Sequence, residues 1–299
     1  MMAFLSVKDT ASKWNMSERS VRNYCQNKRI PGALLIGKTW SIPDDAIKPS
    51  RKLATSKTPR TLYNVLKEEK SLGIKGGIFH KIQIEFTYNS NHIEGSALTH
   101  DETRYIYETN TIGLDQKAIN VDDIIETVNH FRCIDYVIEN CNKIITEKMI
   151  KELHQLLKTG TSDSRQTWFA VGDYKRLPNE VGGIATASPE EVHSQMKKLL
   201  SAYHEISSPD LDALLDFHFQ FDRIHPFQDG NGRIGRLILF KECLKHNIVP
   251  FIITEQLKLF YYRGLSEWKS EPGYLKDTCL TAQDEMKQYL DYFKIIYPV

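Results

Sequence analysis

Long apolar runs are absent from this sequence. The longest candidate, residues 248–253, falls far short of the roughly 20 residues that a membrane-spanning helix needs. The first ten residues include Lys8 and Asp9 and contain no apolar core of signal-peptide length. We therefore expect neither a secretory leader nor a membrane segment, and no membrane among the partners.

Paired cysteines are also absent. The sequence contains five cysteines, an odd number, and no two of them form a Cys-x-x-Cys motif. They are Cys25, Cys133, Cys141, Cys243 and Cys279. This pattern argues against a disulfide framework and against a zinc ribbon. It favours a reducing compartment, and we expect the cytoplasm.

Charge is almost balanced over the whole chain but is unevenly distributed. The net charge is +1, yet residues 1–60 hold 12 Lys and Arg against 4 Asp and Glu, so the remainder is acidic. Hydrophobic residues make up 41% of the chain and charged residues 26%, as in ordinary globular proteins. The distribution predicts a basic N-terminal module attached to a mildly acidic body.

The basic module, residues 1–49, has the pattern of two short helices followed by a small hairpin. Ser6 and Ser17 can each cap a helix, and two apolar pieces meet at a turn formed by Gly37 and Lys38. The expected helices and strands cover residues 7–14, 18–27, 33–36 and 39–42. This order predicts a small winged helix-turn-helix domain.

Two segments of this module, residues 17–22 (Ser-Glu-Arg-Ser-Val-Arg) and 37–43 (Gly-Lys-Thr-Trp-Ser-Ile-Pro), resemble the MerR/excisionase-like helix-turn-helix family. The resemblance implies that the second helix enters the major groove of DNA while basic side chains contact phosphates. The candidate residues are Arg19, Arg22, Lys28 and Arg29. The alternative is a small module for protein docking or dimerisation, and the chain could then form a homodimer.

Residues 50–60 contain few large apolar side chains and are bounded by prolines, which predicts a linker. Beyond it, apolar residues recur at spacings of three and four, which indicates helices. The most regular of these segments are 124–137, 144–157, 192–206 and 211–224. We expect N-terminal helices over residues 61–115 and a mainly α domain over residues 116–290.

The most informative segment is residues 225–236, His-Pro-Phe-Gln-Asp-Gly-Asn-Gly-Arg-Ile-Gly-Arg. Its proline ends the preceding helix, and its glycines permit a tight turn into a new one. The free amides of such a turn, together with the helix dipole, attract an anion. Arg233 and Arg236 suit a polyphosphate, and Asp229 suits Mg²⁺. His225 can accept a proton near neutral pH.

This segment is identified as the signature of the Fic family, HPFx(D/E)GNGRxxR, and it matches at every fixed position. The resemblance covers residues 62–290 and implies a mainly α Fic helical bundle with a short β-hairpin flap. It also implies a protein adenylyltransferase (AMPylase), which uses ATP and Mg²⁺ to attach AMP to Ser, Thr or Tyr hydroxyls of target proteins and of itself.

The resemblance assigns a role to each residue of the loop. His225 would take the proton of the attacking hydroxyl, and Asp229 would hold Mg²⁺. The amides of residues 230–232 would cradle phosphate oxygens, while Arg233 and Arg236 neutralise the β- and γ-phosphates. The implied nucleotide-binding set is Glu94, Val181, Gly182, Gly183, Ile184, Asp229, Gly230, Asn231, Gly232, Arg233, Ile234, Gly235, Arg236, Tyr261, Tyr262 and Lys269.

Two further segments complete this resemblance. Residues 181–184 (Val-Gly-Gly-Ile) predict a hairpin turn and resemble the family's flap, which registers a target by strand addition over the nucleotide. Tyr261 and Tyr262 match the "YYxxL" helix beside the adenosine pocket. A plain surface loop and packing tyrosines are the alternatives. Lys269 stands where many relatives have Asn, which leaves the preferred nucleotide open.

Residues 90–95 (Ser-Asn-His-Ile-Glu-Gly) resemble the family's inhibitory motif, (S/T)xxxE(G/N). Ser90 and Glu94 are four residues apart and share a helical face, and Gly95 suits a helix end. The resemblance implies that Glu94 reaches Arg236 and keeps ATP in a non-productive pose, which defines an autoinhibited type. The alternative is an ordinary exposed glutamate on a helix.

The leading hypothesis is therefore an autoinhibited AMPylase with an N-terminal helix-turn-helix. Within enzymes, the same loop could transfer another group, such as UMP, a phosphate or phosphocholine, or could remove AMP from modified protein. The rival from another class is a DNA-binding transcriptional regulator whose Fic domain only senses nucleotide.

Overall fold

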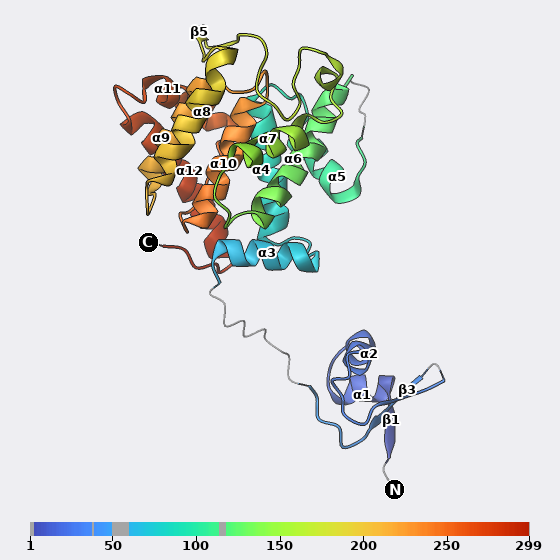
Figure 1. Cartoon of the computed structure of the whole chain (residues 1–299). Coiled ribbons are helices and arrows are strands. Elements are labelled where there is room, and N and C mark those ends of the chain that lie inside the picture. The colour runs from blue at the N-terminus through green and yellow to red at the C-terminus, as the bar shows by residue number, and fades with distance from the viewer. Residues whose placement is uncertain (1–2, 38, 50–59, 114–117, 299) are drawn as a thin grey trace. The chain divides into compact units, whose positions relative to one another are not determined.

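The computed structural model describes residues 3–37, 39–49, 60–113 and 118–298. The chain divides into two units, Met1–Lys57 and Thr58–Val299, each with its own core. Figure 1 shows both units. Of the expected linker over residues 50–60, all but Arg60 lies outside the described residues, as does Lys38 at the expected hairpin turn.

The N-terminal unit consists of two short helices and a three-stranded antiparallel sheet of order β1-β3-β2. Its elements are β1 (Phe4–Ser6), α1 (Val7–Lys13), α2 (Glu18–Gln26), β2 (Leu34–Ile36) and β3 (Thr39–Pro43). Ser6 and Ser17 cap the two helices through their side chains, as predicted. Strand β1 was not predicted, because three residues show no period of their own. It forms by pairing with β3.

The C-terminal unit is mainly α, as predicted, with a single hairpin of two-residue strands among its described residues. Its helices are α3 (Leu62–Leu72), α4 (Ile78–Ile93), α5 (His100–Thr109), α6 (Val121–Glu139), α7 (Glu147–Lys158), α8 (Pro189–His204), α9 (Leu211–Ile224), α10 (Asn231–Lys245), α11 (Lys258–Glu267) and α12 (Gly273–Tyr292). Two 3₁₀ turns, η1 (Asp163–Arg165) and η2 (Glu255–Leu257), and the hairpin β4 (Glu180–Val181) and β5 (Ile184–Ala185) complete it. The four helices expected from apolar spacing are all present as α6, α7, α8 and α9.

Helix α10 lies at the centre of this unit, packed against α9, α6, α7, α4 and α3 (Figure 1). Most of its residues are buried, including the two arginines of its first turns. A helix that is buried on all sides needs charged neighbours for any charge it carries. Partners for Arg233 and Arg236 therefore have to come from other helices.

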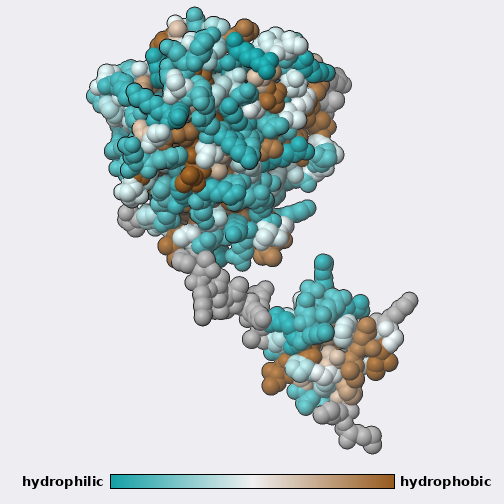
Figure 2. Space-filling view, in the orientation of Figure 1, coloured by the Kyte–Doolittle hydropathy of each residue, from teal (hydrophilic) through white to brown (hydrophobic). Residues whose placement is uncertain are grey.

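The visible face of the C-terminal unit is mostly hydrophilic, with apolar residues in scattered groups (Figure 2). None of the helices in the described part of the chain combines the length and the apolar character needed to cross a membrane.

Candidate active site

The signature loop joins α9 to α10 and is held in place by its own backbone and side chains. His225 ends α9 in the left-handed conformation (φ 49°), and Gly230 begins α10 with φ 82°. A left-handed non-glycine residue is uncommon and persists only where its surroundings fix it. Within the loop, the Phe227 N–H donates to Asn231 Oδ1 at 2.8 Å, and Asn231 Nδ2 donates to the Phe227 carbonyl at 2.8 Å. The Phe227 ring is fully buried and stacks on the ring of His154 with a centroid separation of 4.0 Å.

His225 presents a neutral imidazole. Its Nδ1 lies 3.3 Å from the carbonyl oxygen of Asp222. Because a carbonyl can only accept, Nδ1 carries the proton, and Nε2 keeps a lone pair. Burial, and to a lesser degree the charge of Lys175, lowers the pKa of His225 to about 4. At neutral pH the ring is therefore uncharged and can accept a proton at Nε2.

Asp229 lies in a ring of alternating charges. Its Oδ2 is 2.7 Å from Lys158 Nζ and 3.1 Å from an Arg233 nitrogen, and Glu126 in turn pairs with both cations. Burial alone would raise the pKa of the Asp229 carboxyl, but Arg233 and Lys158 hold it below its usual range. Asp229 is thus ionised, and its side chain remains 48% exposed. An ionised, accessible carboxylate is the ligand that Mg²⁺ uses beside phosphate oxygens, so the residues fit that metal.

Arg236 is contacted by the segment that carries the second motif. Its Nε donates to Ser90 Oγ at 3.1 Å, and another guanidinium nitrogen donates to the Ser90 carbonyl at 2.9 Å and to Glu94 Oε1 at 2.7 Å. Glu94 is the residue at which α4 ends, and Gly95 follows with φ 99°. The contact that was expected from the resemblance is therefore present, between residues 142 positions apart.

The Glu94 carboxylate also occupies the N-terminal end of α10. A Cβ added to Gly232 would lie 2.3 Å from Glu94 Oε1 and 3.0 Å from Arg236. Only glycine at this position allows the carboxylate to approach so closely. An oxygen of Glu94 thus sits where the helix dipole and the guanidinium together attract an anion.

The hairpin expected over residues 181–184 is present as β4 and β5, in which Val181 pairs with Ile184. Gly182 and Gly183 both have positive φ, at 57° and 76°, as the tight turn requires. A cavity of about 600 Å³ lies between this hairpin, the end of α9 and α11. Its lining residues are Val181, Gly182, Ile184, Asp222, Arg223, Tyr262, Arg263, Leu265 and Ser266.

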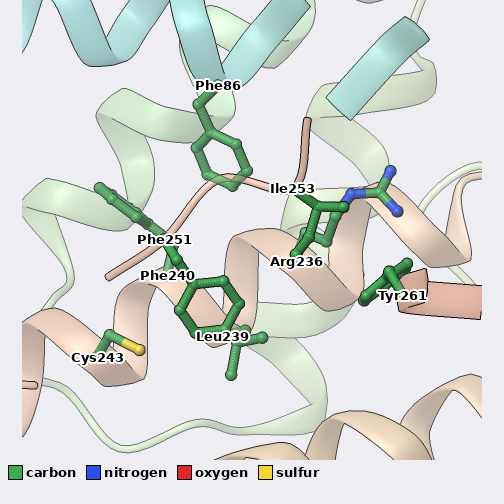
Figure 3. Close-up of a pocket in the computed structure, with 8 residues that line it drawn as sticks. All are labelled: Phe86, Arg236, Leu239, Phe240, Cys243, Phe251, Ile253 and Tyr261. Carbon is green, nitrogen blue, oxygen red and sulfur yellow. The ribbon is translucent and has the colours of Figure 1, made fainter. Parts of the chain in front are cut away.

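The remaining predicted residues lie apart from that cavity. Tyr261 is buried and bonds His218 Nε2 through its hydroxyl at 2.5 Å. Figure 3 shows it next to Arg236, at one end of a small cavity of about 10 Å³ that is lined mostly by apolar side chains. That space holds at most one water molecule. Lys269 is largely exposed, and its Nζ lies 3.5 Å from Asp216 Oδ1. Ile234 and Gly235 are buried in α10, where a Cβ on Gly235 would meet the His218 ring at 2.9 Å.

Three charged residues that belong to the site were not predicted from the sequence. Lys158, at the end of α7, is 2% exposed and pairs with Asp229. Glu126, on α6, joins Lys158 to Arg233. Lys175 is 3% exposed and lies between the hairpin and the loop. No local pattern marks them, because each acquires its partners only through the fold.

Parts of this chain are similar to known proteins. Residues 144–242 match the model of the Fic/DOC family. Protein adenylyltransferase Fic of Culex quinquefasciatus is 28% identical over 183 residues, which cover 60% of this chain and 35% of that protein. The protein of the same name from Drosophila sechellia is 31% identical over 183 residues, with 60% of this chain and 36% of that protein covered. The match thus spans little more than a third of either relative.

The fold of this chain is also similar to that of a solved structure. The crystal structure of a Fic-domain-containing signaling protein from Bacteroides thetaiotaomicron aligns with a TM-score of 0.57 and 25% identity, over 77% of this chain and 90% of that one. The prediction of a mainly helical Fic fold is confirmed. Residues 144–242, which include the signature loop, are therefore similar to the Fic/DOC family.

Proposed function

We propose that this chain transfers AMP from ATP to hydroxyl groups of protein side chains, its own included. The observation that carries the proposal is the neutral His225 imidazole, with a free Nε2, at the mouth of an anion-binding helix start that also holds Arg233 and Arg236. The name of the two insect relatives, protein adenylyltransferase, supports the choice of reaction.

The reaction would proceed by in-line displacement at the α-phosphorus of ATP. Nε2 of His225 accepts the proton as the hydroxyl oxygen forms its bond to phosphorus, and the bond to the β-phosphate oxygen breaks to release pyrophosphate. The amides at the start of α10 bind phosphate oxygens, and the arginines compensate the negative charge. Asp229 would hold Mg²⁺, which would supply positive charge against the phosphates. The protein thus acts by positioning and by charge stabilisation.

The cavity beside the hairpin is the proposed place for the nucleoside. Val181, Gly182 and Ile184 supply one wall and Tyr262 another, a mainly apolar lining with polar groups at the end of α9. Gly183 shapes the turn. Tyr261 and Lys269 lie outside this lining, so we propose no contact of theirs with the base.

We further propose that the resting chain is inhibited by Glu94, because its carboxylate occupies the place of a terminal phosphate on Arg236. Five buried and unpaired cysteines support a cytoplasmic location.

The position of the transferred label tests the reaction. We expect the Glu94→Gly chain to become labelled by ATP that carries the radiolabel on the α-phosphate and to stay unlabelled by ATP with a γ-phosphate label. Labelling from the γ-phosphate would indicate phosphate transfer, and stronger labelling from UTP than from ATP would indicate a different donor. Release of AMP from an already modified chain would indicate the reverse activity. Absence of label from any donor would overturn the proposal.

A second candidate function, DNA binding, is favoured by the surface of α2. One side of this helix buries Val21 and Cys25, while Arg19 and Arg22 are exposed on the opposite side. Exposed Asn23 and Gln26 can read base edges in a groove, and the arginines suit phosphates. We infer that α2 gives the N-terminal unit a surface suited to DNA, in addition to the enzymatic role proposed for the other unit.

Replacing Arg19 and Arg22 with alanine should weaken DNA binding by the full-length chain. We expect the slope of log affinity against log salt to fall by about one for each arginine that contacts a phosphate. Fluorescence anisotropy with random-sequence duplex DNA measures this slope. Lys198→Ala, on the exposed face of α8, is the control and should change nothing. Equal binding by all three proteins would remove α2 as the DNA contact.

A further inference from the structure

Lys175 is a buried ammonium group between the hairpin and the signature loop. Its side chain is almost wholly buried, with the residue 3% exposed. Nζ donates to Asn179 Oδ1 at 2.6 Å, to Thr186 Oγ1 at 2.6 Å and to the Ile224 carbonyl at 3.4 Å. An ammonium group has three donors, so these three acceptors satisfy it fully.

The first two acceptors lie at the base of the hairpin. Asn179 precedes β4 and Thr186 follows β5, so the ammonium closes the hairpin where its two strands part. Thr186 Oγ1 also donates to the Asn179 carbonyl at 2.9 Å, which tightens the same point. The position of residues 180–185 is therefore set by Lys175.

The other contacts lie on both sides of His225. The Ile224 carbonyl, which accepts from Nζ, precedes His225, and the Pro226 carbonyl, which accepts from the Lys175 N–H at 2.9 Å, follows it. Asn179 Nδ2 donates to the Phe227 carbonyl at 3.0 Å. One short segment thus holds the left-handed His225 through its two neighbours in the chain.

Among the described residues, no carboxylate lies within ion-pair distance of Lys175. Burial lowers the pKa of its ammonium group to about 8. Burying a cation without a carboxylate partner costs free energy of folding. An uncharged side chain could link the same groups without that cost. The charge does affect His225, whose pKa it lowers in addition to the larger effect of burial.

We propose that Lys175 is a positioning residue that couples the hairpin to the catalytic loop. It sets the separation between a hydroxyl carried by a chain paired with the hairpin and Nε2 of His225. This inference rests on the proposed function, in which His225 takes the proton of the hydroxyl, and it adds that the substrate chain pairs with the hairpin. Lys175 does not touch the reacting atoms, and its effect is exerted through Asn179 and Thr186 on one side and Ile224 and Pro226 on the other.

The test compares Lys175→Met with Lys175→Arg, both in the Glu94→Gly chain. We expect Lys175→Met to slow labelling from α-labelled ATP by about 100-fold, since a displacement of about 1 Å can have that effect. ATP affinity, measured by equilibrium dialysis, should change by less than about threefold, because every group that binds phosphate is still present. Lys175→Arg retains the charge and should recover part of the rate. Lys197→Met, an exposed lysine on α8, is the matched control.

Two further readouts separate positioning from folding. In Lys175→Met, NMR titration should show a higher pKa for His225, and amide exchange should become faster at residues 180–185 and 225–230 together. Thr186→Val removes one hairpin acceptor while leaving the ammonium in place, and it should slow labelling in the same direction even if Lys175→Met does not fold.

The outcomes are distinct. Labelling of Lys175→Met at the rate of its Glu94→Gly parent, or decreases of ATP affinity and rate in equal proportion, would overturn the role of Lys175. If the Glu94→Gly parent labels nothing, the proposed function fails, but amide exchange still tests the coupling. Unchanged exchange in both segments would then overturn the coupling as well.

Discussion

His225→Ala is expected to lower AMP transfer by about a thousandfold while ATP binding stays within about threefold of the parent. The imidazole is the side chain of the loop that is neutral at pH 7 and has a nitrogen lone pair able to accept a proton. That lone pair is on Nε2, because Nδ1 donates its proton to the Asp222 carbonyl. Without it, the attacking hydroxyl must lose its proton to water. Binding should survive because the phosphate-holding groups are the amides of α10 and the two arginines, none of which depends on the imidazole.

The measurement uses the Glu94→Gly chain as parent, with initial labelling rates from α-labelled ATP and affinity from equilibrium dialysis. His193→Ala is the matched control, since His193 is an exposed histidine of α8 that pairs with Glu147. It should label as the parent does. Transfer by His225→Ala at the parental rate would refute the assignment of the base, and loss of ATP binding would show that the variant damages the loop as a whole.

The same contacts determine how the labelling rate of the Glu94→Gly parent depends on pH. A base must be neutral to act, so transfer is lost as the pH falls through the pKa of His225. Burial lowers that pKa to about 4, against about 6.5 for a free histidine. We therefore expect labelling to change little between pH 8 and pH 6.5 and to fall only at more acidic pH. A fall centred near pH 6.5 would show that the bound nucleotide restores ordinary basicity to the ring.

The parts of this site that sequence could predict are those contained in a contiguous motif or in the spacing of one helix. Residues 225–236 fix the loop, the helix start and the left-handed turn because proline and glycine have narrow or special backbone preferences. The helix over 211–224 was predicted to the residue, since its apolar spacing runs up to the proline. The turn of the hairpin could be predicted from its two consecutive glycines, Gly182 and Gly183.

The parts that could not be predicted are charges whose partners lie far along the chain. By its position, Lys158 is an ordinary lysine in the last turn of an amphipathic helix, which usually faces water. It is buried because Glu126, 32 residues earlier, and Asp229, 71 residues later, meet it in the fold. Lys175 likewise has no helical or strand pattern around it. Buried charges of this kind are recognised only once the opposite charges and carbonyls around them are in place.

Glu94→Gly is expected to raise labelling from α-labelled ATP by about 10- to 100-fold. The carboxylate forms a charge-assisted hydrogen bond of 2.7 Å with Arg236. Bonds of this kind contribute about 1.5–3 kcal/mol, and about 1.4 kcal/mol corresponds to a factor of ten. A terminal phosphate that needs the same guanidinium must first displace Glu94. Removing the carboxylate therefore makes the binding of ATP in its productive pose more favourable by that free energy.

Two variants separate this explanation from a general loosening of α4. Glu94→Gln keeps the length of the side chain and removes the charge, so we expect an intermediate gain. Adding Arg236→Ala to Glu94→Gly should abolish the gain, because the contested guanidinium is then absent. Labelling by Glu94→Gly at or below the wild-type rate would count against an inhibitory role.

The same ion pair predicts a measurable effect on stability. Arg236 is 5% exposed, and in Glu94→Gly it retains the Ser90 bonds but no longer has a carboxylate partner in Glu94. We expect the free energy of unfolding without nucleotide to fall by about 3 kcal/mol, the cost of breaking a buried pair. ATP at about 100 times its dissociation constant for the variant should restore about 2.7 kcal/mol, and urea unfolding with and without ATP measures both. Because the phosphate would take the place of the carboxylate, the variant should gain more stability than the wild-type chain does at the same ATP concentration. Equal gains at that concentration would mean that ATP and Glu94 do not compete for Arg236.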